Sequence, residues 1–109
     1  MQFVVVLITA STEAEAAKIA RALVGEHLAG CVNILPRVRS LYWWQGKVQD
    51  DREALMVVKT RKALLRRLKR RVKELHSYSV PEVIALPLQE GSEEYLRWLA
   101  QATSANPKT

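Results

Sequence analysis

The side chains in this sequence that are best suited to hold a metal ion are His76, Glu82, Cys31 and Asp50. His76 lies five residues before Pro81, and a neutral imidazole is a ligand for copper or zinc, with Glu82 nearby as an oxygen donor. These two ligands alone are too few for a tight site. The alternative role of His76 is to end a helix, where positive charge is favourable. The alternative for the soft donor Cys31 is core packing, since free cysteines are among the most buried residues.

An acidic cluster of Asp50, Asp51 and Glu53 lies near the middle of the chain. Carboxylate oxygens bind hard cations, and several copies of the cluster brought together in an oligomer would bind them more strongly. The alternative is a solvated strand edge whose charges prevent edge-to-edge aggregation.

The residue types that support covalent catalysis do not form a known pattern here. A nucleophile such as Cys31 or a serine needs an adjacent base and a third group that orients the base. His27 and His76 are the two histidines of the chain, and neither lies in a recognisable elbow or triad motif. The sequence also has no P-loop and no dinucleotide fingerprint. We therefore expect a protein that is not an enzyme.

Composition indicates one compact domain. The chain has 109 residues, of which 49% are hydrophobic and 26% charged, with four glycines and four prolines. We assign the domain to residues 1–103 and a frayed tail to 104–109. The single cysteine excludes an internal disulfide and fits a reducing compartment. Because no apolar run approaches the roughly 20 residues that cross a bilayer, we expect no membrane partner and a cytoplasmic location.

Apolar patterning predicts the regular elements that must position these side chains. Strands are expected over 3–9, 31–42, 47–60 and 83–88. Helices are expected over 64–75, over 92–99, and from the capping box at Thr12 to Gly30. Pro36 predicts a bend, and Gln45-Gly46 is a turn signal that makes 31–60 one long hairpin.

The order of these elements predicts the fold class. A βαββαβ order with right-handed crossovers gives a four-stranded antiparallel sheet with two helices on one face. We therefore expect an α+β, ferredoxin-like sandwich with a long hairpin and an extra C-terminal helix.

The hairpin is longer than its domain. Each arm of about 13 residues reaches roughly 43 Å, whereas a domain of this size has a radius of gyration of about 13 Å. Tyr42, Trp43 and Trp44 make the projecting tip apolar, which normally marks an interface. Further copies of the chain, arranged with closed symmetry, are the expected cover. The alternative is that Trp43 and Trp44 pack under the C-terminal helix against Trp98.

Positive charge is concentrated in one segment. Net charge is +6, and nine of the seventeen Lys and Arg residues fall within 59–73. This footprint fits non-specific nucleic-acid binding, with a solvated cationic face as the alternative. RNA-recognition motifs share the strand order but read bases with aromatic residues on central strands, and 53–60 has none. We therefore expect no sequence-specific nucleic-acid partner.

Several separated motifs follow one another along nearly the whole chain. They are KIARALV over 18–24, AGCVNILP over 29–36, SLYWWQGK over 40–47, VKT over 58–60, HSYSVPE over 76–82 and YLRWL over 95–99. In this order and spacing they resemble the CutA divalent-cation tolerance family. The resemblance implies a ferredoxin-like subunit, similar to that of PII signalling proteins, assembled as a homotrimer through its long hairpins.

The resemblance also implies binding of Cu(II) or another divalent cation and a role in the response to metal ions. Some bacterial members bind metal with a cysteine in the first strand and a pair of histidines. Here Ile8 replaces that cysteine, Leu75 replaces the first histidine and Ser77 replaces a proline, so that only His76 remains. A copper site of that form is not expected.

Two alternatives that do not depend on metal remain open. One is a PII-like signalling or structural trimer whose clefts between subunits bind a small anion, with Lys59 or Arg61 supplying charge. The other is the weak, non-specific nucleic-acid binder that the basic helix suggests.

Overall fold

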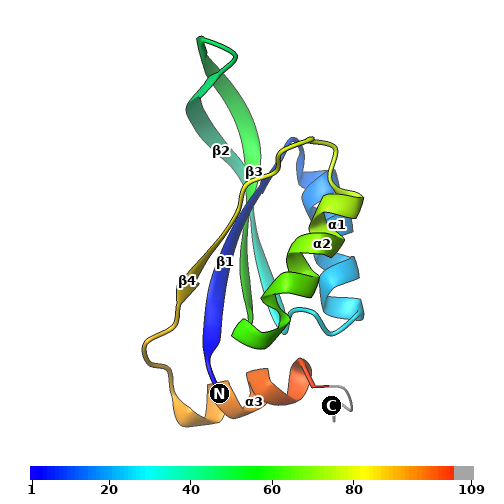
Figure 1. The fold of residues 1–109 in the computed structure, drawn as a ribbon, viewed down its shortest axis with the longest axis vertical. Coiled ribbons are helices and arrows are strands. Elements are labelled where there is room, and N and C mark those ends of the chain that lie inside the picture. The colour runs from blue at the N-terminus through cyan, green and yellow to red at the C-terminus, as the bar shows by residue number, and fades with distance from the viewer. Residues whose placement is uncertain (105–109) are drawn as a thin grey trace.

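The structure, a computed structural model, describes residues 1–104. Its elements are β1 (Phe3–Ala10), α1 (Glu13–Gly25), β2 (Cys31–Trp44), β3 (Lys47–Arg61), α2 (Leu65–Leu75), β4 (Val83–Pro87) and α3 (Glu93–Ala102), with a 3₁₀ turn, Lys62–Leu64, before α2. The strands pair antiparallel in the order β2-β3-β1-β4, and α1 and α2 cover one face of the sheet (Figure 1). This confirms the predicted α+β, ferredoxin-like fold.

The core lies between the sheet and these two helices. Every second residue of β1 is buried, from Val4 to Ala10, because successive strand side chains point to opposite faces. They pack with Ile19 and Leu23 of α1 and with the predicted apolar face of α2, where Leu68 and Val72 are fully buried. Sequence patterning predicts that β1 is covered on both faces, but in the single chain only the helical face is fully covered.

The first helix is shorter than expected. Its beginning is confirmed, since the Glu15 backbone N–H donates to the Thr12 hydroxyl at 3.1 Å. Its end is corrected from Gly30 to Gly25, because His27 takes a left-handed backbone conformation with φ of 59°. The Leu28 N–H then bonds to the Leu23 carbonyl and closes the helix.

The long hairpin projects as expected. Gln45 and Gly46 both have positive φ, which is the two-residue turn that matches the twist of the strands. Pro36 and Arg37 face a single residue of β3, and this bulge bends β2 where the proline predicted it. The described chain extends 45 Å along its longest axis, with a radius of gyration of 14.5 Å.

The tip of the hairpin lies at the opposite end of the molecule from α3 (Figure 1). Trp43 is 73% exposed, and the Trp98 ring instead lies beside that of Tyr95, with ring centroids 5.5 Å apart. The alternative in which Trp43 and Trp44 pack under the C-terminal helix is therefore wrong. The predicted tail over 104–109 lies, apart from Ser104, outside the described residues.

Candidate functional site

His76 ends α2 and is held from two sides. Its backbone N–H donates to the Val72 carbonyl, and its Nε2 donates to the Thr9 carbonyl at 2.7 Å. Nδ1 accepts the Tyr78 backbone N–H at 3.0 Å, so the ring is neutral and carries its proton on Nε2. The side chain has no exposed surface, and its ring centroid lies 4.7 Å from that of Tyr78. Both ring nitrogens are therefore already used by the protein.

Glu15 fixes the segment that follows His76. Its carboxylate accepts the Ser77 backbone N–H at 2.8 Å and both the hydroxyl and the backbone N–H of Ser11. Burial by itself raises the pKa of Glu15, but the hydrogen bonds from Ser77 and Ser11 outweigh burial and lower the pKa to about 2. A charged Glu15 thus ties the chain after α2 to the start of α1.

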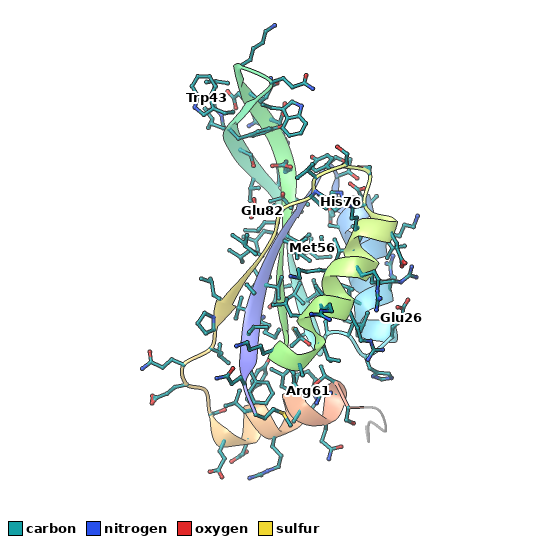
Figure 2. The ribbon with its side chains drawn as sticks, in the orientation of Figure 1. Glu26, Trp43, Met56, Arg61, His76 and Glu82 are labelled. Carbon is teal, nitrogen blue, oxygen red and sulfur yellow. The ribbon has the colours of Figure 1, made fainter. Side chains whose placement is uncertain are left out.

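A cleft of about 690 Å³ lies where the hairpin leaves the domain. Tyr42 and Trp44 line it from β2, Glu53 from β3, and Tyr78 and Glu82 from the segment between α2 and β4. Figure 2 shows His76 and Glu82 together at this end of the molecule, with Trp43 beyond them at the hairpin tip. The volume of this cleft is within the range of small-ligand sites.

The acidic cluster is divided among three different partners. Two Arg39 nitrogens donate to the Asp50 carboxylate at 2.8 and 2.6 Å, which lowers the pKa of Asp50. The Tyr42 hydroxyl donates to Asp51 at 2.5 Å, and this bond raises the pKa of Tyr42 to about 12. Neither carboxylate is thus free of a partner within the chain. The third member, Glu53, lies lower on β3 in the cleft.

Glu53 is a buried carboxylate with a single donor. It is 7% exposed and accepts the Tyr78 hydroxyl at 2.8 Å. Burial, together with this bond, raises the pKa of Tyr78 above its ordinary value, so the phenol stays protonated and keeps donating. Sequence reasoning placed Glu53 in the acidic cluster but missed its pairing with Tyr78, because no local spacing predicts a contact between β3 and a loop 25 residues later.

Glu82 is the sequence-predicted ligand that remains available. Its side chain is exposed in the cleft, and no other residue in the range 1–104 forms a hydrogen bond or ion pair with it. The one lysine or arginine that lines the cleft within this range is Arg39, whose charge is offset by Asp50. The carboxylates of Glu53 and Glu82 therefore make the cleft favourable for a cation and unfavourable for an anion.

Cys31 and Lys59 lie elsewhere, on the face of the sheet away from the helices. They are directly paired across β2 and β3, with Cys31 Sγ 3.9 Å from the Lys59 ammonium, which also donates to the Asn33 side chain. Arg61 lies at the end of the molecule that carries α3 (Figure 2), where it donates to the hydroxyl and carbonyl of Thr103. The two cations proposed for an anion are thus occupied within the chain.

The predicted metal ligands do not converge in one chain. Across residues 1–104 there is no group of three or more His, Cys, Asp or Glu side chains placed to hold a metal ion. The structure brings His76 and Glu82 to the same end of the domain, leaves Cys31 on the sheet face and places Asp50 out on the hairpin. A cation in the cleft would have the Glu82 and Glu53 carboxylates and neighbouring hydroxyls as oxygen donors.

The sheet face away from α1 and α2, here called the open face, is apolar over β1 and β4, while Lys59 and Asn33 add polar groups toward β2. Register places Leu7 between Ile84 and Val57, and Val5 beside Leu86, in rows across the sheet. Ile84 and Leu86 are 52% and 53% exposed, and the others are half-buried. Both edge strands, β2 and β4, have a free edge, since each pairs with one neighbour among the described strands.

No helix in the described range is long and apolar enough to span a membrane.

Comparisons with known proteins agree with one another. A family model described as CutA1 divalent ion tolerance protein matches residues 4–102. A relative named divalent-cation tolerance protein CutA, from Thermus thermophilus, is 54% identical over 91% of this chain and 96% of its own. A chloroplastic CutA 1 protein of rice is 47% identical over 92% of this chain but only 56% of its own, so the chain spans about half of that relative.

Solved structures show the same similarity in space. The Cut A1 structure from Thermus thermophilus has a TM-score of 0.91 at 53% identity and covers 94% of this chain and 99% of its own. The CutA1 structure from rice has a TM-score of 0.93 at 44% identity and covers 97% of each chain.

Proposed function

Because this chain belongs to the CutA1 divalent ion tolerance family, we propose that it is a homotrimeric, cytoplasmic protein that binds divalent cations in the cleft at the base of its hairpin. The observation that carries the cation site is the Glu82 carboxylate, which lines the cleft without a partner in the described chain, beside buried Glu53. The proposed role is metal tolerance through binding, without a catalysed reaction.

The open face supports the proposal of an oligomer. Its apolar rows would cost free energy if they stayed in water, at about 25 cal/mol per Å² of apolar surface. Further copies of the chain cover such a face, and the free edges of β2 and β4 permit strand pairing between copies. The number three follows the resemblance to CutA and PII-like trimers.

The ligand atoms that the cleft offers a cation are oxygens. Glu82 and Glu53 supply carboxylates. Hydroxyl groups of the cleft would form hydrogen bonds with water molecules bound to the ion. Such a site selects weakly, and Cu(II) is expected to bind more tightly than Mn(II) because affinities follow the Irving–Williams order. His76 joins the site only if its ring leaves the Tyr78 N–H, and Cys31 and Asp50 only if another subunit brings them close.

A titration tests the cation site. We expect Cu(II) to bind the wild type, measured by calorimetry, and Glu82→Gln to weaken that binding by at least about tenfold, since a charged ligand is lost. The matched control is Glu90→Gln, which removes an exposed carboxylate outside the cleft and should change nothing. Equal binding by Glu82→Gln and wild type would remove the cleft as the site.

His76 needs its own variant. Glu82→Gln with unchanged binding, together with loss of binding in His76→Asn, would place the metal on the imidazole instead. Circular dichroism of His76→Asn shows whether the buried site still folds. Light scattering with and without chelator should give a mass near three times the 12.4 kDa of one chain in both cases. A monomer would contradict the proposed assembly.

The small-anion alternative is less well supported by this geometry. The cleft carries excess negative charge, and Lys59 and Arg61 are already bound within the chain. If one anion from a panel raised the melting temperature, and raised it further at higher concentration, this preference would be reversed.

A further inference from the structure

The outward surface of α2 and of the turn before it carries positive charge without matching acids. Its exposed cations, here called the cationic face, are Lys62, Arg66, Arg67, Lys69, Arg70 and Lys73. None of them forms an ion pair with another residue of the range 1–104. By contrast, Arg71 on the same helix pairs with Glu26 and Glu74, and Arg39 and Arg97 on other elements also have carboxylate partners. The excess charge of the protein is thus gathered on one helix.

This arrangement works against the helix that carries it. Lys62 and Arg66, Arg66 and Arg70, and Lys69 and Lys73 are like-charged pairs four residues apart, which destabilise a helix. The first turn of α2 has no acidic residue to complement the positive end of the helix dipole. Leu68 and Val72 in the core hold the helix in place despite this repulsion. An anion on the outside would relieve it.

The cationic face is long enough to reach several phosphate groups along one strand of a duplex. From Lys62 to Lys73 the segment is about 17 Å long, which equals roughly five phosphate steps along one strand of a duplex. At one end a hollow of about 300 Å³ lies between Lys69 and Lys73 on α2 and Ser79 to Pro81 on the following segment. Two lysines and the Ser79 hydroxyl group line this hollow beside Val80, Pro81 and Val83, and ammonium and hydroxyl groups are donors that can bind a phosphate group.

We propose that the cationic face of α2 binds the phosphate backbone of double-stranded nucleic acid without sequence specificity. A duplex is favoured over a single strand because 62–75 contains no aromatic residue on which unpaired bases would stack. The apolar side of α2 is buried in the core, so the helix has no apolar face to insert into a membrane.

The cationic face stays accessible in the proposed oligomer. The helices α1 and α2 cover one side of the sheet, and the open face is the other side (Figure 1). Contacts between copies through the open face therefore leave α2 outward, once per subunit. Several weak surfaces on one particle would increase the apparent affinity for a long duplex.

Fluorescence anisotropy with a labelled random-sequence DNA duplex tests the proposal on the full chain. Between about 50 and about 200 mM salt the wild type should lose affinity steeply, because each neutralised phosphate contributes a slope of about 0.9. In the test variant, Arg66, Lys69 and Lys73 are all changed to Gln. It should bind at least about tenfold more weakly at low salt, and the slope of log affinity against log salt concentration should be about 2 to 3 smaller in magnitude.

The matched control changes Arg37, Lys47 and Arg97 to Gln, which removes the same charge from exposed positions outside α2. It should bind almost as the wild type does, and both variants should keep the wild-type mass and circular dichroism. Equal loss in the two variants would overturn the proposal, as would no binding at low salt. Tighter binding to a single strand, or binding to phosphatidylserine vesicles but not to duplex, would also overturn it.

Discussion

The open face of the sheet and the cationic face of α2 are both uncovered in the single chain, but water treats them differently. The open face presents Leu7, Val57 and Ile84 in a row, and apolar area in water has a continuous free-energy cost. The cationic face presents ammonium and guanidinium groups, which water solvates well. The open face therefore requires a permanent partner, whereas the cationic face supports a partner that salt can displace.

The largest expected effect comes from placing a charge on the open face. Val57→Asp should convert the protein to monomers or unfold it, because an aspartate in the middle of an apolar contact is desolvated without a partner. Light scattering measures the mass, and circular dichroism separates dissociation from unfolding. Arg67→Asp, which introduces the same side chain on the cationic face, should leave the oligomeric mass unchanged. A Val57→Asp protein that keeps its oligomeric mass would show that the open face is not the contact.

A smaller effect should follow from Glu15, which holds the segment between the cleft and the cationic face. Its pKa is lowered to about 2 in the folded protein, from an ordinary value of 4.5. Its contribution to stability is therefore present above about pH 4.5 and is lost as pH falls through 2, a loss of about 3 kcal/mol.

Glu15→Gln should remove that part of the acid destabilisation, measured by denaturant unfolding at several pH values. The matched control is Glu13→Gln, which changes an exposed carboxylate two residues away on the same helix and should keep the wild-type pH dependence. The paired rows of the open face contain no carboxylate. The mass of the oligomer should therefore not change with pH before unfolding begins. Identical pH profiles for wild type and Glu15→Gln would contradict the role assigned to this carboxylate.

The smallest effect distinguishes the one paired cation of α2 from its neighbours. Arg71 donates to Glu26, which caps the end of α1, and to Glu74, with its nearest oxygen at 3.0 Å. Arg71→Gln should lower the melting temperature by at most a few degrees, because surface ion pairs contribute little. Arg67→Gln should leave it unchanged or raise it slightly, since like-charge repulsion is reduced. If both variants lose the same amount, the ion pair with Glu26 contributes nothing.

The fold could be predicted from local patterns because its signals lie within short windows. The apolar stripe of α2, the Thr12 cap and the Gln45-Gly46 turn each act over a few residues, and the structure confirms all three. The end of α1 could not be predicted in this way. The helix ends because His27 has a left-handed backbone conformation, and glycine or asparagine, not histidine, is the usual residue at such a position.

The candidate site was predictable only as a list of residue types. Glu82 was identified from its place near His76, and the cleft leaves it available. The ring of His76, however, has both nitrogens engaged with backbone groups from two segments, one of them 67 residues earlier in the chain. No spacing in the sequence indicates that His76 will have both ring nitrogens engaged, while His27 contacts the Ala102 carbonyl through Nδ1.

The sequence by itself determined the order of strands and helices, the projecting apolar hairpin and the concentration of positive charge on one helix, because periodicity and composition are properties of the chain. Only the tertiary structure decided which charges have partners. Arg39 meets Asp50, Tyr78 meets Glu53 and Arg71 meets Glu26 across separate elements, while Glu82 and the cationic face do not find a partner in the described chain. Pairing depends on distances of a few ångströms, and those are set by packing rather than by position along the chain.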